Sequence, residues 1–181
     1  MKRRRITMQR VTQHISDPLD FVVNNASNQA RSLEFRDVGF NIAVYGDKHY
    51  ILRFSTEDNT GERRFGITIR ETLNLIFKTI KHILYYIFKI DNFNPINFPS
   101  SKLRNQRIVL IDKLLDQEDL NVVVEIHFDN IETYEFTIIT AMRVDDFNIG
   151  DGQYIIEMTN NSSVLKQFVR GTKKVVDDFD N

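Results

Sequence analysis

Hydrophobic residues recur at helical spacing over one long segment of the chain. The aliphatic residues of this segment follow each other at alternating steps of four and three positions: Ile69, Leu73, Ile76, Ile80, Ile83, Ile87 and Ile90. This spacing places them on one side of an α-helix. Thr68 and Glu71 form the Thr-x-x-Glu pattern of a capping box at its start. The pattern predicts a helix over residues 68–90, and we expect Leu73, Ile76, Ile80 and Ile83 to be buried.

Alternation of apolar and polar residues, which is typical of half-buried strands, occurs on both sides of this helix. Before the helix, residues 38–44 and 50–54 alternate around the turn pair Gly46-Asp47, which predicts a β-hairpin. After the helix, the same alternation predicts four consecutive strands, at residues 107–112, 121–128, 134–144 and 152–158.

The two ends of the chain carry weaker signals. Asp17 and Pro18 precede apolar residues at helical spacing, which predicts a helix over residues 18–31. Ser162-Ser163 can cap a short helix that contains Val164, Leu165, Phe168 and Val169. We expect residues 1–16 to be a flexible basic arm and residues 171–181 to be a frayed acidic tail.

These elements together predict a single α+β domain over residues 1–181. In it, the long helix packs on a four-stranded antiparallel meander, and an N-terminal helix and a β-hairpin precede both. The regular stripe on the long helix leaves a second arrangement open, in which the helix packs on another copy of the chain.

Composition then narrows the chemistry. The absence of Cys excludes disulfides, thiolate nucleophiles and Cys-based metal sites, and 24 basic against 25 acidic residues give no overall bias towards a polyanion. The four His residues are far apart in sequence, and no Walker loop, GxGxxG or HExxH motif occurs. We therefore expect neither a metal nor a cofactor. Many Ile and Asn with few Ala are typical of an AT-rich genome, so we expect a bacteriophage or low-GC bacterial source.

The chain has no pattern that predicts a membrane location. The basic start at residues 1–5 is not followed by the apolar region of a secretory signal, and the apolar segment 67–90 carries too many charged residues for a bilayer span. We expect a soluble protein in the bacterial cytoplasm, or in the virion if it is phage-encoded.

One group of residues has the chemistry for binding and cleaving a phosphodiester. His49 and Arg53 are four positions apart on the expected return strand, so they share a face, and Arg63 with Arg64 immediately precedes the long helix. Guanidinium groups and a helix N-terminus can bind phosphate, and an imidazole can move a proton. The alternative is a solvated hairpin face beside a polar loop.

A second pair consists of two hydroxyl groups on successive expected strands. Thr140 interrupts an apolar alternation, and Tyr154 follows on the next strand in the sequence. Such a pair could orient a phosphate or a ribose. The alternative is a Thr satisfied at a strand end and a Tyr that packs in the core.

Residues 62–72 (ERRFGITIRET) resemble the entry into a helix in small RNase-like toxins, and residues 122–126 with 136–142 resemble the paired strands of the same group. This group is the barnase/EndoU/colicin/RelE-like ribonuclease superfamily, including its phage-borne members. Met142 stands where the group usually has an aromatic residue. The resemblance implies an α+β fold and metal-independent endoribonuclease activity.

Two function hypotheses follow from these observations. In the first, the protein binds or cleaves RNA: His49 is the acid/base, Arg53 with Arg63 and Arg64 binds phosphate, and Thr140 and Tyr154 orient the substrate. The catalytic group is then His49, Arg53 and Tyr154, and the phosphate-binding group is Arg63, Arg64 and Thr140. In the second, it is a non-catalytic phage structural or host-takeover protein that forms oligomers or binds a protein partner.

Overall fold

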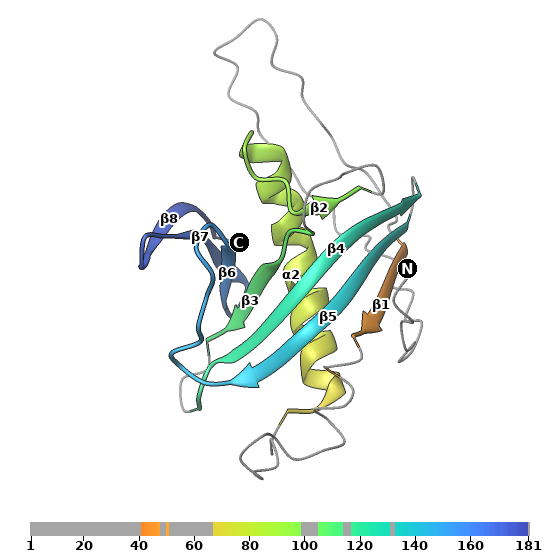
Figure 1. The fold of residues 1–181 in the computed structure, drawn as a ribbon, viewed down its shortest axis with the longest axis horizontal. Coiled ribbons are helices and arrows are strands. Elements are labelled where there is room, and N and C mark those ends of the chain that lie inside the picture. Colours follow the sequence, from red (N-terminus) through yellow and green to blue (C-terminus); the bar gives the residue numbers. More distant parts are fainter. Residues whose placement is uncertain are drawn as a thin grey trace, which may run out of the picture.

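The computed structural model describes residues 41–47, 50, 67–98, 105–113, 117–130 and 133–180. This part of the chain forms one helix, α2 (Ile69–Lys89), and an eight-stranded sheet (Figure 1). The strands are β1 (Asn41–Gly46), β2 (Ile96–Asn97), β3 (Ile108–Asp112), β4 (Leu120–Asn130), β5 (Thr133–Arg143), β6 (Tyr154–Thr159), β7 (Ser162–Val169) and β8 (Thr172–Phe179).

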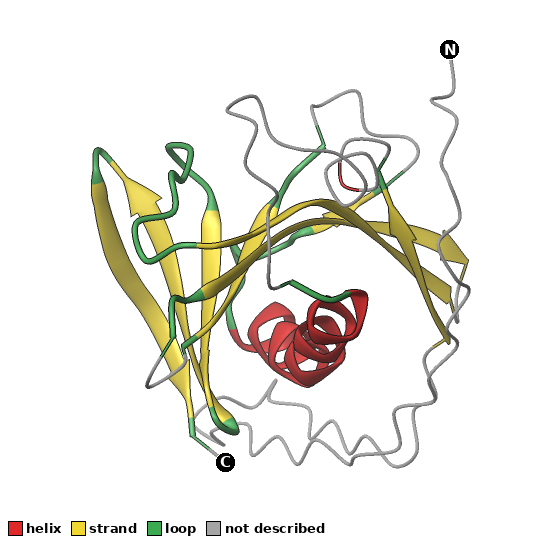
Figure 2. Ribbon diagram, turned by 90° about the horizontal axis from the view of Figure 1, so that it is seen from below, coloured by secondary structure: helices red, strands yellow, loops and turns green. Residues whose placement is uncertain are grey.

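The sheet is mixed, and its strand order is β1-β5-β4-β3-β6-β7-β8, with the short β2 added alongside β4. Antiparallel pairing joins β3, β4 and β5, and it also joins β6, β7 and β8. Parallel pairing between β3 and β6 connects these two groups, and β1 adds to β5 in parallel. Figure 2 shows the resulting sheet curving around α2.

Helix α2 begins as the sequence predicts. The Thr68 side chain accepts a hydrogen bond from the backbone N–H of Glu71, and the Glu71 carboxylate accepts one from the backbone N–H of Thr68 at 2.6 Å. This reciprocal capping box satisfies two of the N–H groups that a helix start leaves without partners. The helix ends at Lys89, and Ile90 is its C-cap.

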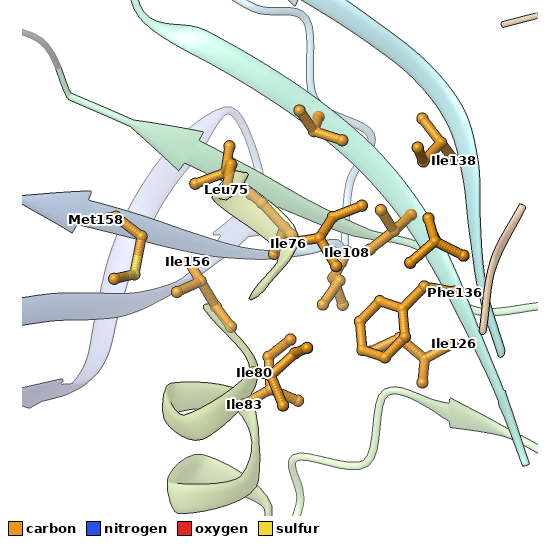
Figure 3. Packing of buried hydrophobic residues seen from close by; sticks show 14 of the residues in the cluster. Leu75, Ile76, Ile80, Ile83, Ile108, Ile126, Phe136, Ile138, Ile156 and Met158 are labelled. Atoms are coloured by element: carbon orange, nitrogen blue, oxygen red, sulfur yellow. The ribbon is translucent and has the colours of Figure 1, made fainter. Parts of the chain in front are cut away.

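The main core lies between α2 and the concave side of the sheet (Figure 3). The side chains of Ile76, Ile80 and Ile83 are at most 4% exposed, and they contact strands from both groups. Their neighbours from the sheet include Ile108, Val124, Ile126, Phe136, Ile138, Ile156, Met158 and Leu165. The helix therefore joins the β3-β4-β5 group and the β6-β7-β8 group through one shared core.

The buried side of α2 is turned relative to the predicted stripe. Ile69 is 41% exposed and Leu73 is only partly buried, whereas Leu75 and Tyr86 are fully buried. Tyr86 contacts β7 through Ser163. Strands β6 to β8 thus cover a flank of the helix that a flat four-stranded sheet would leave open.

A second, smaller core covers the convex side of the sheet. It contains Val109, Ile111, Val123, Ile149 and Ile155, with Ile139, Phe147 and Phe168 packed against it. Phe147 and Ile149 belong to the segment between β5 and β6, which therefore crosses this side of the sheet. Strands β5 and β3 are both antiparallel to β4, so they run in the same direction. The connection from β5 crosses the sheet before β6 begins, and β6 therefore also runs in this direction and pairs in parallel with β3.

The structure corrects the predicted fold class of a long helix on a four-stranded antiparallel meander. The sheet has eight strands and is mixed, and the fourth strand of the expected meander, β6, pairs in parallel with β3 instead of continuing beyond β5. The predicted helix at residues 18–31 and the arm at residues 1–16 lie outside the described residues.

Three local predictions also differ from the structure. Strand β1 pairs with β5 in parallel, and Tyr50, the one described residue of the expected return strand, is helical. The segment that Ser162-Ser163 was expected to cap is strand β7, and most of the expected frayed tail is strand β8. Arg170 (φ 52°) and Gly171 (φ 79°) join β7 to β8 in the two-residue turn that favours a tight hairpin.

The position of Ile80 predicts a large effect of truncation. Its side chain is 4% exposed at the centre of the helix–sheet contact, so Ile80→Ala should lower the free energy of unfolding by about 2–5 kcal/mol. The matched control is Ile69→Ala on the exposed first turn, which should change it by less than about 0.5 kcal/mol. Urea denaturation measures both, and an Ile80→Ala loss as small as that of the control would contradict the packing described here.

Candidate functional site

The four residues of the predicted phosphate-binding cluster lie outside the described residues. His49, Arg53, Arg63 and Arg64 all belong to the segment that joins β1 to α2. Their convergence therefore stays a prediction.

The structure places Thr140 and Tyr154 apart. Thr140 on β5 lies opposite Val123, which belongs to the convex core, and residues opposite each other in a ladder share a face. Tyr154 on β6 packs against the concave core, where its ring meets Phe93 at 4.9 Å between centroids. Strands β4 and β3 separate β5 from β6, so the two hydroxyl groups do not form a joint site.

A charged cluster on the sheet is centred on Glu125 of β4. Its side chain is 10% exposed. The carboxylate accepts hydrogen bonds from Asn105 at 2.8 Å and from Arg107 Nε at 2.9 Å, and His127 Nε2 lies 3.2 Å from it. Arg107 precedes β3, and His127 follows two positions along β4, so pairing of the two strands brings the three side chains together.

This cluster contains groups that could act on a phosphodiester, but its carboxylate is already engaged. Burial alone would raise the pKa of Glu125, whereas the hydrogen bonds from His127, Asn105 and Arg107 together lower it to about 2. A carboxylate with so low a pKa is a weak general base near neutral pH. The Arg107 side chain is 45% exposed, so it is the part of the cluster that an anion can reach.

A buried polar cluster joins α2 to β7. His82 Nδ1 lies 2.8 Å from Ser163 Oγ, and Tyr86 Oη lies 2.8 Å from the same oxygen and donates to the Ser163 carbonyl at 3.0 Å. Burial lowers the pKa of His82 to about 4, with Lys81 and Lys78 adding to the effect, and burial raises the pKa of Tyr86 to about 12. His82 is fully buried, so this Ser–His contact is closed to a substrate and serves to attach the helix to β7.

The end of α2 is attached to β8 by a neighbouring contact. Lys89 lies 2.8 Å from an Asp177 carboxylate oxygen and also donates to the Tyr85 hydroxyl, and these bonds raise the pKa of Lys89. The Phe179 ring packs edge-on against both Tyr85 and His82. These contacts hold the concave side of β8 against the helix.

The described residues offer little for a cofactor or metal. Within the described ranges, no group of three or more His, Asp or Glu residues is arranged to hold a metal ion. A small hollow between α2, β1, β2, β4 and β5 is lined by Ile42, Ile80, Ile83, Leu84, Ile87, Ile96, Ile126, Tyr134 and Phe136. Among the helices that the structure describes, none is both long and apolar enough to cross a membrane.

Sequence reasoning missed the polar clusters for identifiable reasons. Glu125 and His127 were visible as polar residues two apart on a predicted strand, but Arg107 meets them only through strand pairing. Ser163 was read as a helix cap, which hid its position opposite Met158 on the concave side.

Comparisons of the chain with protein-family models, curated proteins and solved structures gave no match. The resemblance to the RelE-like ribonucleases therefore stays a prediction.

The buried His82 predicts a specific pH dependence of stability. Its pKa is about 4 in the folded state and about 6.5 when unfolded. As pH falls, the unfolded chain therefore takes up the proton before the folded protein does. The neutral His82 contributes about 3 kcal/mol to the free energy of unfolding. This contribution is complete above pH 6.5 and is lost as pH falls to about 4.

We expect the difference in unfolding free energy between the wild type and His82→Gln to shrink by this amount between pH 7 and pH 4, as measured by urea denaturation. The other His residues titrate in both proteins, so their contributions cancel when the two free energies of unfolding are subtracted. A constant difference, or a ring whose NMR titration midpoint is near 6.5, would show that His82 is not held neutral.

Proposed function

We propose that the protein is a non-catalytic interaction protein, which binds a protein partner or a second copy of itself. The observation that carries this proposal is the exposed edge strand β8. Its first residues, 172–176, are all exposed, and Val175 and Val176 are 65% and 41% exposed. An edge strand presents unpaired backbone N–H and C=O groups, which another strand can pair with.

The state of the polar clusters supports the same proposal. In the described part of the chain, both carboxylate oxygens of Glu125 accept hydrogen bonds and the His82 ring is fully buried. Both are the residue types that acid–base catalysis uses, and here both join elements of the fold.

The stripe on α2 does not support the proposal. The central isoleucines of that stripe are covered by the sheet of the same chain, so they are not available to a second copy. The interaction surface is sought at the sheet edge instead.

RNA binding or cleavage is the second candidate, and the observation that favours it is the Arg107–Glu125–His127 cluster. A guanidinium and an imidazole that meet at one carboxylate are groups that metal-free phosphodiester cleavage can use. On this candidate, His49 with Arg53, Arg63 and Arg64 supplies the remaining chemistry. A phage source, and a place in the host cytoplasm or the virion, are part of both candidates.

An RNA cleavage assay separates the two candidates. The protein is incubated with a structured RNA in the presence of EDTA, beside His49→Ala and Arg107→Ala. We expect no cleavage above buffer by any of the three, because the described acid–base groups are engaged within the fold.

Cleavage by the wild type that His49→Ala or Arg107→Ala abolishes, with thermal stability unchanged, would replace the interaction proposal with the ribonuclease. Equal cleavage by all three proteins would indicate a contaminating nuclease, and the assay is then repeated on protein from an independent purification.

A further inference from the structure

The exposed edge of β8 has a charge order that is complementary to itself. Residues 173–178 read Lys-Lys-Val-Val-Asp-Asp. When two such strands run antiparallel about a point between the valines, Lys173 meets Asp178 of the second copy, and Lys174 meets its Asp177. Within its own copy, Asp177 also pairs with Lys89, and Lys173 Nζ lies 3.9 Å from a Glu157 carboxylate oxygen. The two valines then meet each other at the centre, where Val175 is the most exposed large hydrophobic residue recorded for the described chain.

In this pairing, the two residues of each charge pair also lie on the same face of the joined sheet, because β8 contains a bulge. Lys166 lies opposite Val175 and Leu165 lies opposite Asp177, so Val176 is an extra residue in the ladder. In a regular strand, residues 173 and 178 would point to opposite faces, since they differ by an odd number.

With the bulge, Lys173 and Asp178 lie on one face. Their partners on β7 are Phe168 and Val164, which are four positions apart in a regular part of the strand. Lys174 and Asp177 lie on the other face, opposite Gln167 and Leu165. Residues that oppose each other in an antiparallel pair must share a face, and the bulge fulfils this condition for both charge pairs.

Edge strands are often protected from pairing by Lys residues and bulges. Here the same features select one register. Sliding one β8 by two positions sets Lys or Asp opposite Val, and only the central register aligns the two bulges. The pattern excludes irregular edge-to-edge pairing while it favours one symmetric pair.

We propose that β8 pairs with β8 of a second copy about a twofold axis, which joins the two eight-stranded sheets into one. This rests on the proposed interaction function and names its partner as the chain itself. Figures 1 and 2 show β8 as the outermost strand at the end of the sheet opposite β1. A closed twofold pair uses one such edge from each copy, so the assembly stops at two.

A charge-swap experiment tests this pairing. Lys173→Asp places Asp opposite Asp178 at both ends of the pair, and Asp178→Lys places Lys opposite Lys173. Light scattering across a concentration series should show a dimer for the wild type and a dissociation constant about tenfold or more higher for each variant. An equimolar mixture of the two variants should regain the dimer, because every pair in the mixed species is again Lys with Asp.

Matched controls change the same charges away from the edge. Arg70→Asp and Asp91→Lys alter exposed positions at the two ends of α2, and both should dimerise as the wild type does. Circular dichroism and thermal unfolding check that every variant is folded; Lys174→Asp is the substitute if Lys173→Asp is not.

A monomeric wild type at every concentration, or a dimer that both charge reversals leave intact, would overturn β8 pairing. So would a mixture that stays monomeric. These results would overturn β8 pairing only. The proposed interaction function is tested separately, by the RNA cleavage assay.

Discussion

A helix with one apolar side must bury that side against the apolar surface of another element. In this protein the surface is the concave side of one continuous sheet, and the contact with α2 holds its two antiparallel groups together. The parallel β3–β6 pairing is the seam between these groups. Burial of side chains such as Ile76 and Ile83 from the helix against Ile108 and Ile156 on either side of the seam makes that pairing favourable.

The curvature has local causes as well. Register shifts at Val123/Val124 in the β4–β5 ladder and at Leu165/Lys166 in the β7–β8 ladder each add an extra residue to one strand, and bulges bend and twist the strand that carries them. The crossing segment with Phe147 and Ile149 covers the convex side. The sheet is thus buried on both faces at its middle and open at β8.

This arrangement accounts for the state of the polar groups. Wherever α2 meets the sheet, a buried polar atom must find a partner within the fold. His82 Nδ1 and Tyr86 Oη find theirs in Ser163, and Lys89 finds Asp177, whereas His82 Nε2 is buried without a hydrogen-bond partner in the part of the chain that the structure describes. Among the described residues, these polar side chains therefore attach one element of the fold to another.

The elements that the sequence predicted correctly are those that depend on interactions between residues close together in the chain. Helix α2, its capping box and strands β3 to β6 were predicted to within a few residues, because periodicity and capping act over short stretches. Strand β7 was missed because apolar residues on both of its faces erase the alternation and imitate helical spacing. The order of the strands depends on which pairs meet across the core, which short-range spacing does not encode. Of the candidate site, only Thr140 and Tyr154 fall in the described residues, and their separation follows from that strand order.

Native-state hydrogen exchange tests the central claim most directly. If α2 holds both strand groups together, the amides of Leu75 to Tyr86 and those of β3, β4 and β6 should exchange only through global unfolding, with the same free energy as urea denaturation reports. The result that would contradict the account is exchange of the α2 amides through a much smaller opening while β3, β4 and β6 stay protected, since the sheet would then hold its shape without the helix.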